Sequence, residues 1–369
     1  MKEIAKVAFV IIGTFIGAGF ASGQEIYLFF FSYGINGLLG ILISSILMGV
    51  VISRTLKIIK QNNVQNYKEF LDIIIHKKKK GKKPLKTQKF TNAQNSKRNA
   101  KENSESSIVI KLINLLVNTF TLVTFFIMIA GFGTYFAQEF GINQLVGSFV
   151  LATITYIILN TSVRGVVKAN GIIVPILIIL VVIIGILNIR NLPLLQIKNY
   201  MIPNNDITFV LQAILYASYN SILLIPVLIT LNKYIKSKRQ INLISIVSSI
   251  IIAIMSILIF LLLTKVDVDI GKLEMPAVYV VSNMFYILKY LYGFVILGSI
   301  FTTTISLGMS FLQNTSKNKK SYSHIALIMC ITSVVVSKIG FSNLVNLLYP
   351  LFGYLGLLQI YKILIKNAQ

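Results

Sequence analysis

The residues best suited to bind a ligand lie in the first apolar run, where the sequence would interrupt a helix. Four glycines occur within eleven residues, at Gly13, Gly17, Gly19 and Gly23. Each weakens a helix by about 1 kcal/mol relative to alanine. The run from Ser22 to Glu25 also fits a capping box, in which Ser caps a new helix and Glu reaches back to it. We therefore expect the helix to stop near Gly17–Gly19 and to restart near Ser22, which frees carbonyl and amide groups for a solute or an ion.

The same glycines have a second interpretation. Gly13-x-x-x-Gly17 and Gly19-x-x-x-Gly23 are pairs of small residues four apart, and such pairs allow two membrane helices to pack closely without any break. The first run alone does not favour one interpretation over the other.

A second cluster of small and polar residues lies in the sixth apolar run. The residues from 216 to 221 read Tyr-Ala-Ser-Tyr-Asn-Ser, with Pro226 just after them. Ser218, Asn220 or Ser221 could cap a half-helix that restarts there, so we expect this span to be interrupted too. The alternative is a polar contact between continuous helices.

Glu25 is the one carboxylate that the sequence places inside an apolar run rather than at the edge of a loop. Carboxylates within a membrane segment are functional candidates. Glu25 could carry a proton or form an outer gate, or it could serve only as the capping residue. These roles are compatible, because a capping carboxylate can still be protonated.

The elements that hold these residues must be membrane helices. Hydrophobic residues make up 55% of the 369-residue chain and charged residues 12%, with a mean hydropathy of +0.78. A span needs about 20 apolar residues, and only a helix satisfies an isolated backbone in lipid. The sequence therefore predicts an all-α, polytopic membrane protein of ten spans: 7–31, 36–58, 108–137, 143–161, 166–188, 206–231, 241–263, 280–313, 323–338 and 341–364.

The basic residues support this number of spans. If each run crosses once, 29 of the 35 Lys and Arg fall on the side of the N-terminus and six on the other. Positive charge gathers in cytoplasmic loops, so we expect both termini in the cytoplasm and the chain in a plasma membrane. The net charge of +24 is accounted for by these loops and does not indicate nucleic-acid binding.

The segment 76–107 is polar, basic and nearly free of large apolar residues, so we expect a disordered cytoplasmic loop. Within it, 76–101 could anchor the chain to anionic lipid, because each basic residue near an acidic leaflet contributes about 1 kcal/mol. A tolerated low-complexity insertion is the alternative.

An odd number of spans in each half would invert the two halves, 1–188 and 206–365, relative to each other. Interrupted segments at corresponding positions of inverted repeats are typical of transporters, so we expect the two halves to form one transporter domain. The run GAGFASGQE from Gly17 to Glu25, followed by Phe29-Phe30 and Tyr33-Gly34, resembles the start of the YkvI-type bacterial membrane proteins. These belong with the amino acid–polyamine–organocation superfamily, and Tyr219-Asn220 extends the likeness. The basic insertion departs from the compact loop expected at that place.

The resemblance implies the LeuT-type fold of five plus five helices, and uptake of amino acids or similar solutes, often driven by Na⁺ or H⁺. In carriers of this type a Ser/Thr pair on the eighth span and carbonyls of the first span hold sodium, which implies Thr303 and Thr304 here. Hydroxyls that bond to their own helix are the alternative. Half-helix amino ends attract anions, so a solute carboxylate should meet amides near Ala18–Ser22. The expected solute-binding residues are Gly17, Ala18, Gly19, Ala21, Ser22, Ser218, Tyr219 and Asn220, and the expected ion-coupling residues are Thr303, Thr304 and Glu25.

Two further interpretations remain open. The same fold could sense a solute rather than transport it, as a receptor of the germinant type would. Aromatic residues of the third span, such as Phe125 and Phe132, could line a solute site or simply pack. We expect no enzyme, no cofactor beyond a coupling Na⁺ or H⁺ and no disulfide, because no phosphate loop or metal-spaced cluster occurs and Cys330 is the only cysteine.

Overall fold

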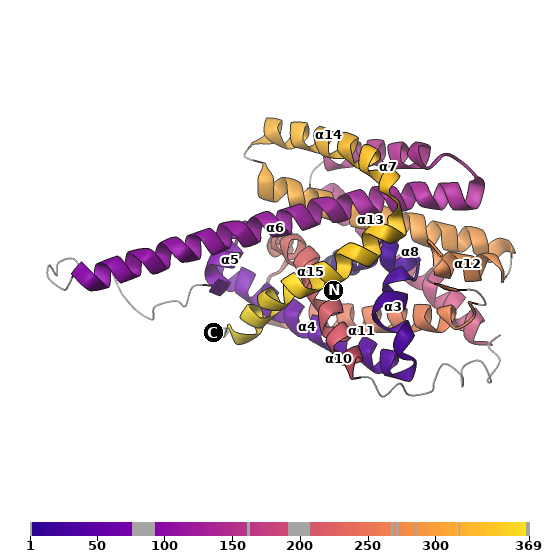
Figure 1. The fold of residues 1–369 in the computed structure, drawn as a ribbon, viewed down its shortest axis with the longest axis horizontal. Coiled ribbons are helices and arrows are strands. Elements are labelled where there is room, and N and C mark those ends of the chain that lie inside the picture. Colours follow the sequence, from indigo (N-terminus) through magenta and orange to yellow (C-terminus); the bar gives the residue numbers. More distant parts are fainter. Residues whose placement is uncertain are drawn as a thin grey trace.

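A computed structural model describes residues 2–75, 93–160, 163–190, 207–266, 269–270, 273–284, 286–316 and 318–366. Over these residues the chain folds into helices that pack side by side as one bundle (Figure 1). The long helices are α4 (Ile35–Asn62), α6 (Ala93–Phe140), α7 (Gln144–Leu159), α8 (Val163–Arg190), α10 (Thr208–Thr230), α11 (Lys238–Leu263), α13 (Tyr286–Thr315), α14 (Lys319–Val336) and α15 (Phe341–Ile365).

Ten membrane crossings can be drawn through the described helices. Eight of them are long and apolar enough to span a bilayer without interruption. The shorter α7 is also apolar. The tenth crossing is made by α1 (Lys2–Phe15), α2 (Ala18–Ala21) and α3 (Gln24–Phe29), which follow one another as an interrupted span. The predicted all-α fold of about ten membrane helices is confirmed.

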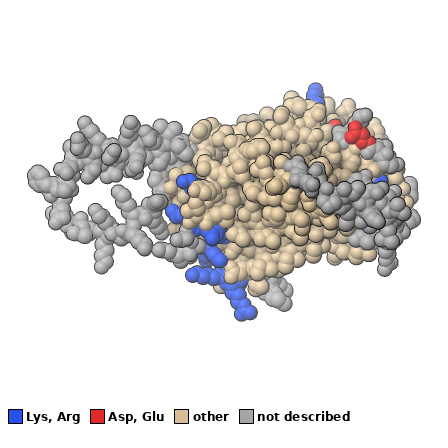
Figure 2. Space-filling view, turned by 60° about the horizontal axis from the view of Figure 1, so that its bottom comes forward, with Lys and Arg blue, Asp and Glu red and all other residues tan. Residues whose placement is uncertain are grey.

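The outer surface of the bundle is largely apolar. Figure 2 shows Lys and Arg side chains mainly toward one end of the visible face and acidic side chains toward the other, with uncharged residues between them. Large apolar side chains such as Ile46 on α4, Phe149 on α7 and Ile246 on α11 are more than half exposed. In water this exposure would be unfavourable, whereas a bilayer solvates such side chains.

The interrupted first span lies inside the bundle. Its helix α1 packs against α8, α11 and α13, and α2 contacts α6 and α13. Helix α10 also lies inside and packs most extensively on α15 and α4. The α10–α15 approach is close at Gly356, where an added Cβ would lie 2.5 Å from the carbonyl oxygen of Ser218. Glycine is therefore required at this crossing.

The predicted break in the sixth span is wrong. Helix α10 is continuous from Thr208 to Thr230, with Pro226 inside it. The Ser221 hydroxyl donates to the Ser218 carbonyl at 2.7 Å, and the Asn220 amide donates to the Tyr216 carbonyl at 3.0 Å. These polar side chains satisfy themselves on their own helix instead of capping a new one. The alternative, a polar contact between continuous helices, is confirmed only in the continuity of the helix, because Ser221 and Asn220 bond within α10 and not across the contact.

The predicted disordered loop is only partly testable. Helix α6 begins at Ala93, so the backbone of 93–107 is helical, contrary to the prediction. The rest of that loop, 76–92, lies outside the described residues. Before it comes the short amphipathic helix α5 (Tyr67–Ile75), which packs on α6 (Figure 1).

Candidate functional site

The first span is interrupted twice. Helix α1 ends at Phe15, and Gly17 is extended, with φ −92° and ψ −168°, before the single turn α2 begins at Ala18. The second interruption comes at Gly23, whose φ of +83° is the left-handed conformation that glycine adopts without strain. The predicted break is present, but the chain resumes its helix at Ala18 and again at Gln24, rather than once at Ser22.

The capping box is present only in part. The Ser22 hydroxyl accepts a hydrogen bond from the Gln24 amide at 3.3 Å and donates one to the Gly19 carbonyl at 3.1 Å. Glu25 does not reach back to Ser22, whose own amide bonds to the Ala18 carbonyl. Glu25 instead accepts a hydrogen bond from Tyr219 of α10.

The Glu25 carboxylate lies at the centre of a buried cluster, which we call the Glu25 cluster: Glu25, Phe29, Tyr216, Tyr219 and Tyr349. The Tyr219 hydroxyl of α10 donates a hydrogen bond to Glu25 Oε2. Glu25 is 3% exposed and forms no ion pair with any residue that the structure describes. A carboxylate in such a place costs several kcal/mol unless a cation or a proton accompanies it.

Aromatic rings fix the position of Tyr219. Its ring is stacked between Phe29, with centroids 5.5 Å apart, and Tyr349 of α15, with centroids 4.8 Å apart. Tyr216 meets Tyr219 and Phe29 edge to face. On the opposite side, Gly19 leaves room for the acid, because an added Cβ would lie 2.5 Å from Glu25 Oε1. The cluster therefore joins α3, α10 and α15 around one carboxylate, and Gly19 of α2 packs against it.

The eighth span supplies a hydroxyl to the first break. Thr303 Oγ1 donates to the carbonyls of Gly13 at 2.7 Å and Ile16 at 3.1 Å. Thr302 also approaches Gly13, at 3.4 Å. Thr304 instead bonds to the Ile300 carbonyl of its own helix at 2.6 Å. Two carbonyls and one hydroxyl oxygen thus meet at the end of α1, a set of hard oxygen ligands that suits Na⁺.

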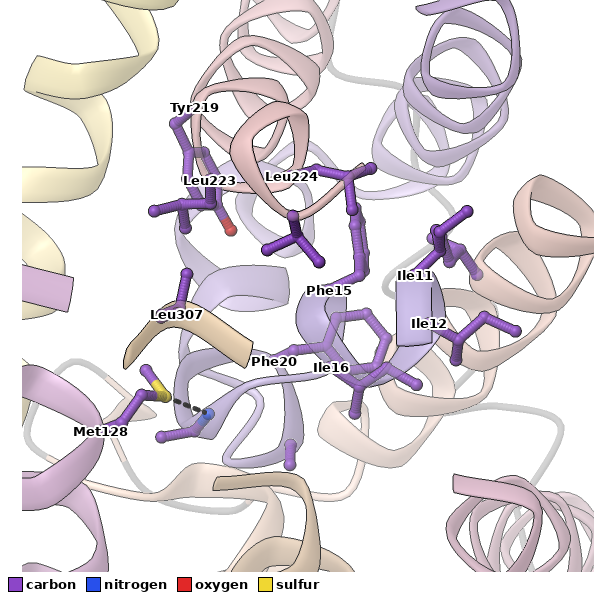
Figure 3. Close-up of a cluster of buried hydrophobic side chains, with 14 of the residues drawn as sticks. Ile11, Ile12, Phe15, Ile16, Phe20, Met128, Tyr219, Leu223, Leu224 and Leu307 are labelled. Carbon is purple, nitrogen blue, oxygen red and sulfur yellow. Dashed lines mark hydrogen bonds between the residues drawn. The ribbon is translucent and has the colours of Figure 1, made fainter. Parts of the chain in front are cut away.

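Met128 of α6 also contacts the first break (Figure 3). Its thioether accepts a hydrogen bond from the Ala18 amide at 3.3 Å, shown as the dashed line in Figure 3. An added Cβ at Gly17 would lie 3.2 Å from the Met128 sulfur and 3.4 Å from Thr303 Cγ2. The amide at the start of α2 is therefore held only by a weak acceptor.

The structure brings most of the predicted site residues together and separates others. Gly17, Ala18, Gly19, Tyr219 and Glu25 lie around the two breaks. The hydroxyl of Ser218, fully buried at the α15 crossing, has no hydrogen-bond partner among the described residues.

For two of the remaining predicted residues, the structure shows hydrogen-bond partners that the sequence did not specify. Asn220 bonds to its own helix. The Ala21 carbonyl accepts a hydrogen bond from the Tyr292 hydroxyl of α13 at 2.7 Å, so Ala21 is joined to the eighth span.

Sequence reasoning missed three residues of this site. Met128, Tyr292 and Tyr349 are ordinary apolar or aromatic residues of spans three, eight and ten. Each contacts the first span or Tyr219, and more than a hundred residues of sequence separate the two partners. No local pattern marks them, because helix packing alone decides which face of a span points to the break.

No family model matches the chain. It is similar to two Bacillus subtilis (strain 168) proteins, the uncharacterized membrane protein YkvI and the uncharacterized protein YyaD. The chain and YkvI are 26% identical over 366 residues, covering 99% of this chain and 96% of YkvI. The chain and YyaD are 24% identical over 377 residues, covering 98% and 97%. The predicted resemblance to YkvI is confirmed, and the superfamily stays a prediction.

Solved structures with a similar fold are transporters. MhsT in complex with L-phenylalanine matches with a TM-score of 0.68, at 15% identity, over 96% of this chain and 87% of MhsT. A Na⁺-coupled sialic acid symporter matches at 0.66, with 12% identity over 98% and 79% of the two chains. A manganese transporter of Eremococcus coleocola matches at 0.63, with 13% identity over 98% and 78%. These likenesses establish the LeuT-type fold of the chain.

Proposed function

We propose that this protein is a secondary-active transporter that carries a small organic solute, such as an amino acid, across the membrane with a coupling ion. The observation that carries the proposal is the doubly interrupted first span. Its breaks lie between Thr303 of α13 and Tyr219 of α10, inside the bundle. Non-helical backbone at membrane depth is tolerated where it is buried in protein or lines a cavity, and in transporters such broken helices form the solute and ion sites. The transporters of similar fold support the same conclusion.

The amide of Ala18 is the group best placed to meet a solute carboxylate. It is held by a thioether, a weak acceptor, at 3.3 Å. A carboxylate would form a stronger, charge-assisted hydrogen bond there. Ala18 and Met128 are both at most 1% exposed, so the solute reaches them only after the bundle opens. Rocking of one group of helices against the other would provide that opening.

Glu25 is our candidate for proton coupling. Its carboxylate lies beside Gly19 and Phe20, next to the amide expected to meet the solute. An ionised Glu25 would repel a solute carboxylate, whereas a protonated Glu25 would not. Solute binding and proton binding therefore favour each other, as symport requires. The Thr303 hydroxyl with the Gly13 and Ile16 carbonyls is the candidate Na⁺ site.

Proteoliposomes loaded with the purified protein test the proposal. Uptake of labelled amino acids, including L-phenylalanine, is measured with an inward pH gradient, an inward Na⁺ gradient, both or neither. We expect Glu25→Gln to abolish the part driven by the pH gradient, and Thr303→Val to abolish any part driven by Na⁺. Glu3→Gln is the matched control for Glu25, since Glu3 is exposed and pairs with Lys6.

Three results would count against the proposal. Solute binding without flux would indicate a receptor rather than a transporter. Uptake that keeps its full pH dependence in Glu25→Gln would remove Glu25 from the coupling mechanism. Uptake that keeps its Na⁺ dependence in Thr303→Val would do the same for the candidate Na⁺ site.

A further inference from the structure

A cavity of about 360 Å³ lies between α5, α6 and α15, at the end of the bundle that carries the C-terminus. Its inner wall is formed by Leu71 of α5, Val117 of α6, Ile222 of α10 and Phe352 of α15, all at most 8% exposed. The volume falls within the range of pockets that hold small ligands, roughly 300–1,000 Å³. The wall is apolar, so the cavity suits a hydrocarbon chain rather than a polar solute.

The mouth of this cavity opens toward the lipid. Leu112 and Leu116 of α6 and Leu355 and Leu358 of α15 line it and are 37–55% exposed. Because these helices form the outer surface of a membrane bundle, their exposed leucines face acyl chains and not water. An occupant therefore enters from the bilayer.

Polar groups lie at one place in the lining, near the end of α15. Gln359 is 6% exposed. Its amide nitrogen makes no hydrogen bond of normal geometry with any described residue, although Tyr67 of α5 lies close to it. Lys362, one turn further along α15, also lines the cavity. A donor without a partner and an ammonium group suit an anion, since each gains a charge-assisted hydrogen bond.

We propose that this cavity binds an anionic phospholipid of the cytoplasmic leaflet. One acyl chain fills the apolar part, and the phosphate lies at Lys362 and Gln359. Basic pockets between membrane helices on the cytoplasmic side bind anionic head groups. The site itself consists of the α5, α6, α10 and α15 residues named above.

The bound chain would touch the helices that hold the Glu25 cluster. Ile222 lies one turn after Tyr219 on α10, and Phe352 lies one turn after Tyr349 on α15. Tyr219 and Tyr349 are stacked on each other. A lipid in the cavity therefore contacts α10 and α15 about one turn away from the stacked Tyr219 and Tyr349.

Native mass spectrometry of the full-length protein tests this proposal without using transport. The protein is exchanged into detergent with palmitoyl-oleoyl phosphatidylglycerol, the matching phosphatidylcholine, or oleic acid. We expect tighter retention of phosphatidylglycerol than of phosphatidylcholine. Lys362→Gln should reduce that preference about fivefold, since a basic residue near the head group contributes about 1 kcal/mol. Lys60→Gln is the matched control, because Lys60 is exposed on α4 and lies outside the cavity.

A second pair of variants tests the acyl-chain pocket. Leu116→Trp should fill the mouth and reduce retained lipid by at least half, whereas Leu115→Trp, 62% exposed and outside the lining, should not. Leu355→Trp against Leu351→Trp repeats the test on α15 in case Leu116→Trp fails to fold. Equal retention in blocked and control variants overturns the proposal. So does equal retention of the two phospholipids, and so does retention of oleic acid alone, which would identify a free fatty acid.

Discussion

The contact between Gly19 and Glu25 provides the sharpest test of the site geometry. In Gly19→Ala, the new methyl would lie 2.5 Å from Glu25 Oε1, 2.9 Å from Cγ and 3.1 Å from Cδ. Gly19 lies within α2 and does not have a positive φ, so alanine fits its backbone. The substitution therefore acts by driving the Glu25 side chain away from Tyr219.

The size of the effect can be worked from three contributions. Loss of the hydrogen bonds to a buried carboxylate costs about 1–3 kcal/mol. Crowding of a packed interior costs about 1–3 kcal/mol. Alanine offsets up to about 1 kcal/mol, because it favours helix more than glycine does. We expect Gly19→Ala to lower the free energy of unfolding by roughly 1–6 kcal/mol.

A double-mutant cycle with Glu25→Ala tests the cause. Removal of the carboxylate vacates the space, so Gly19→Ala should then be nearly neutral. The unfolding free energies are measured by titrating the purified protein from mixed micelles into sodium dodecyl sulfate. Gly171→Ala on α8 is the control, because a Cβ there meets nothing within 4 Å. An equal loss in both backgrounds would refute the predicted contact.

Three further predictions follow from the same geometry. Thr303→Val should remove any thermal stabilisation by Na⁺ relative to K⁺, whereas Thr304→Val, which loses only a bond to its own helix, should keep it. The stabilisation would be about 2.7 kcal/mol at a hundred times Kd, and its survival in Thr303→Val would exclude this site. Tyr219→Phe should cost about 1–3 kcal/mol through Glu25 while preserving the ring stack, and an unchanged unfolding free energy would show that the hydrogen bond is not needed. Gly356→Ala should lower the apparent melting temperature, because its Cβ meets the backbone of α10 at 2.5 Å, and wild-type stability would contradict that close crossing.

Local chemistry explains which features could be predicted. The number of spans follows from the length of apolar runs against the thickness of a bilayer, and the break in the first span follows from four glycines in eleven residues. Both depend on residues that are close in sequence. The same reasoning failed for α10, where Ser221 and Asn220 satisfy their hydrogen bonds on their own helix. A polar cluster in a span is compatible both with a broken helix and with a continuous one.

The sequence by itself therefore determined that this protein lies in a lipid bilayer, which fold class it has and which segment is interrupted. Tertiary structure decided what the interruption meets. It turned Glu25 from a capping residue into the partner of Tyr219, separated Thr303 from Thr304, and placed Met128 against the Ala18 amide. The physical reason is that side-chain partners on a helix depend on which face points inward and at what height a neighbour crosses. Those two quantities are fixed by the packing of all the spans together.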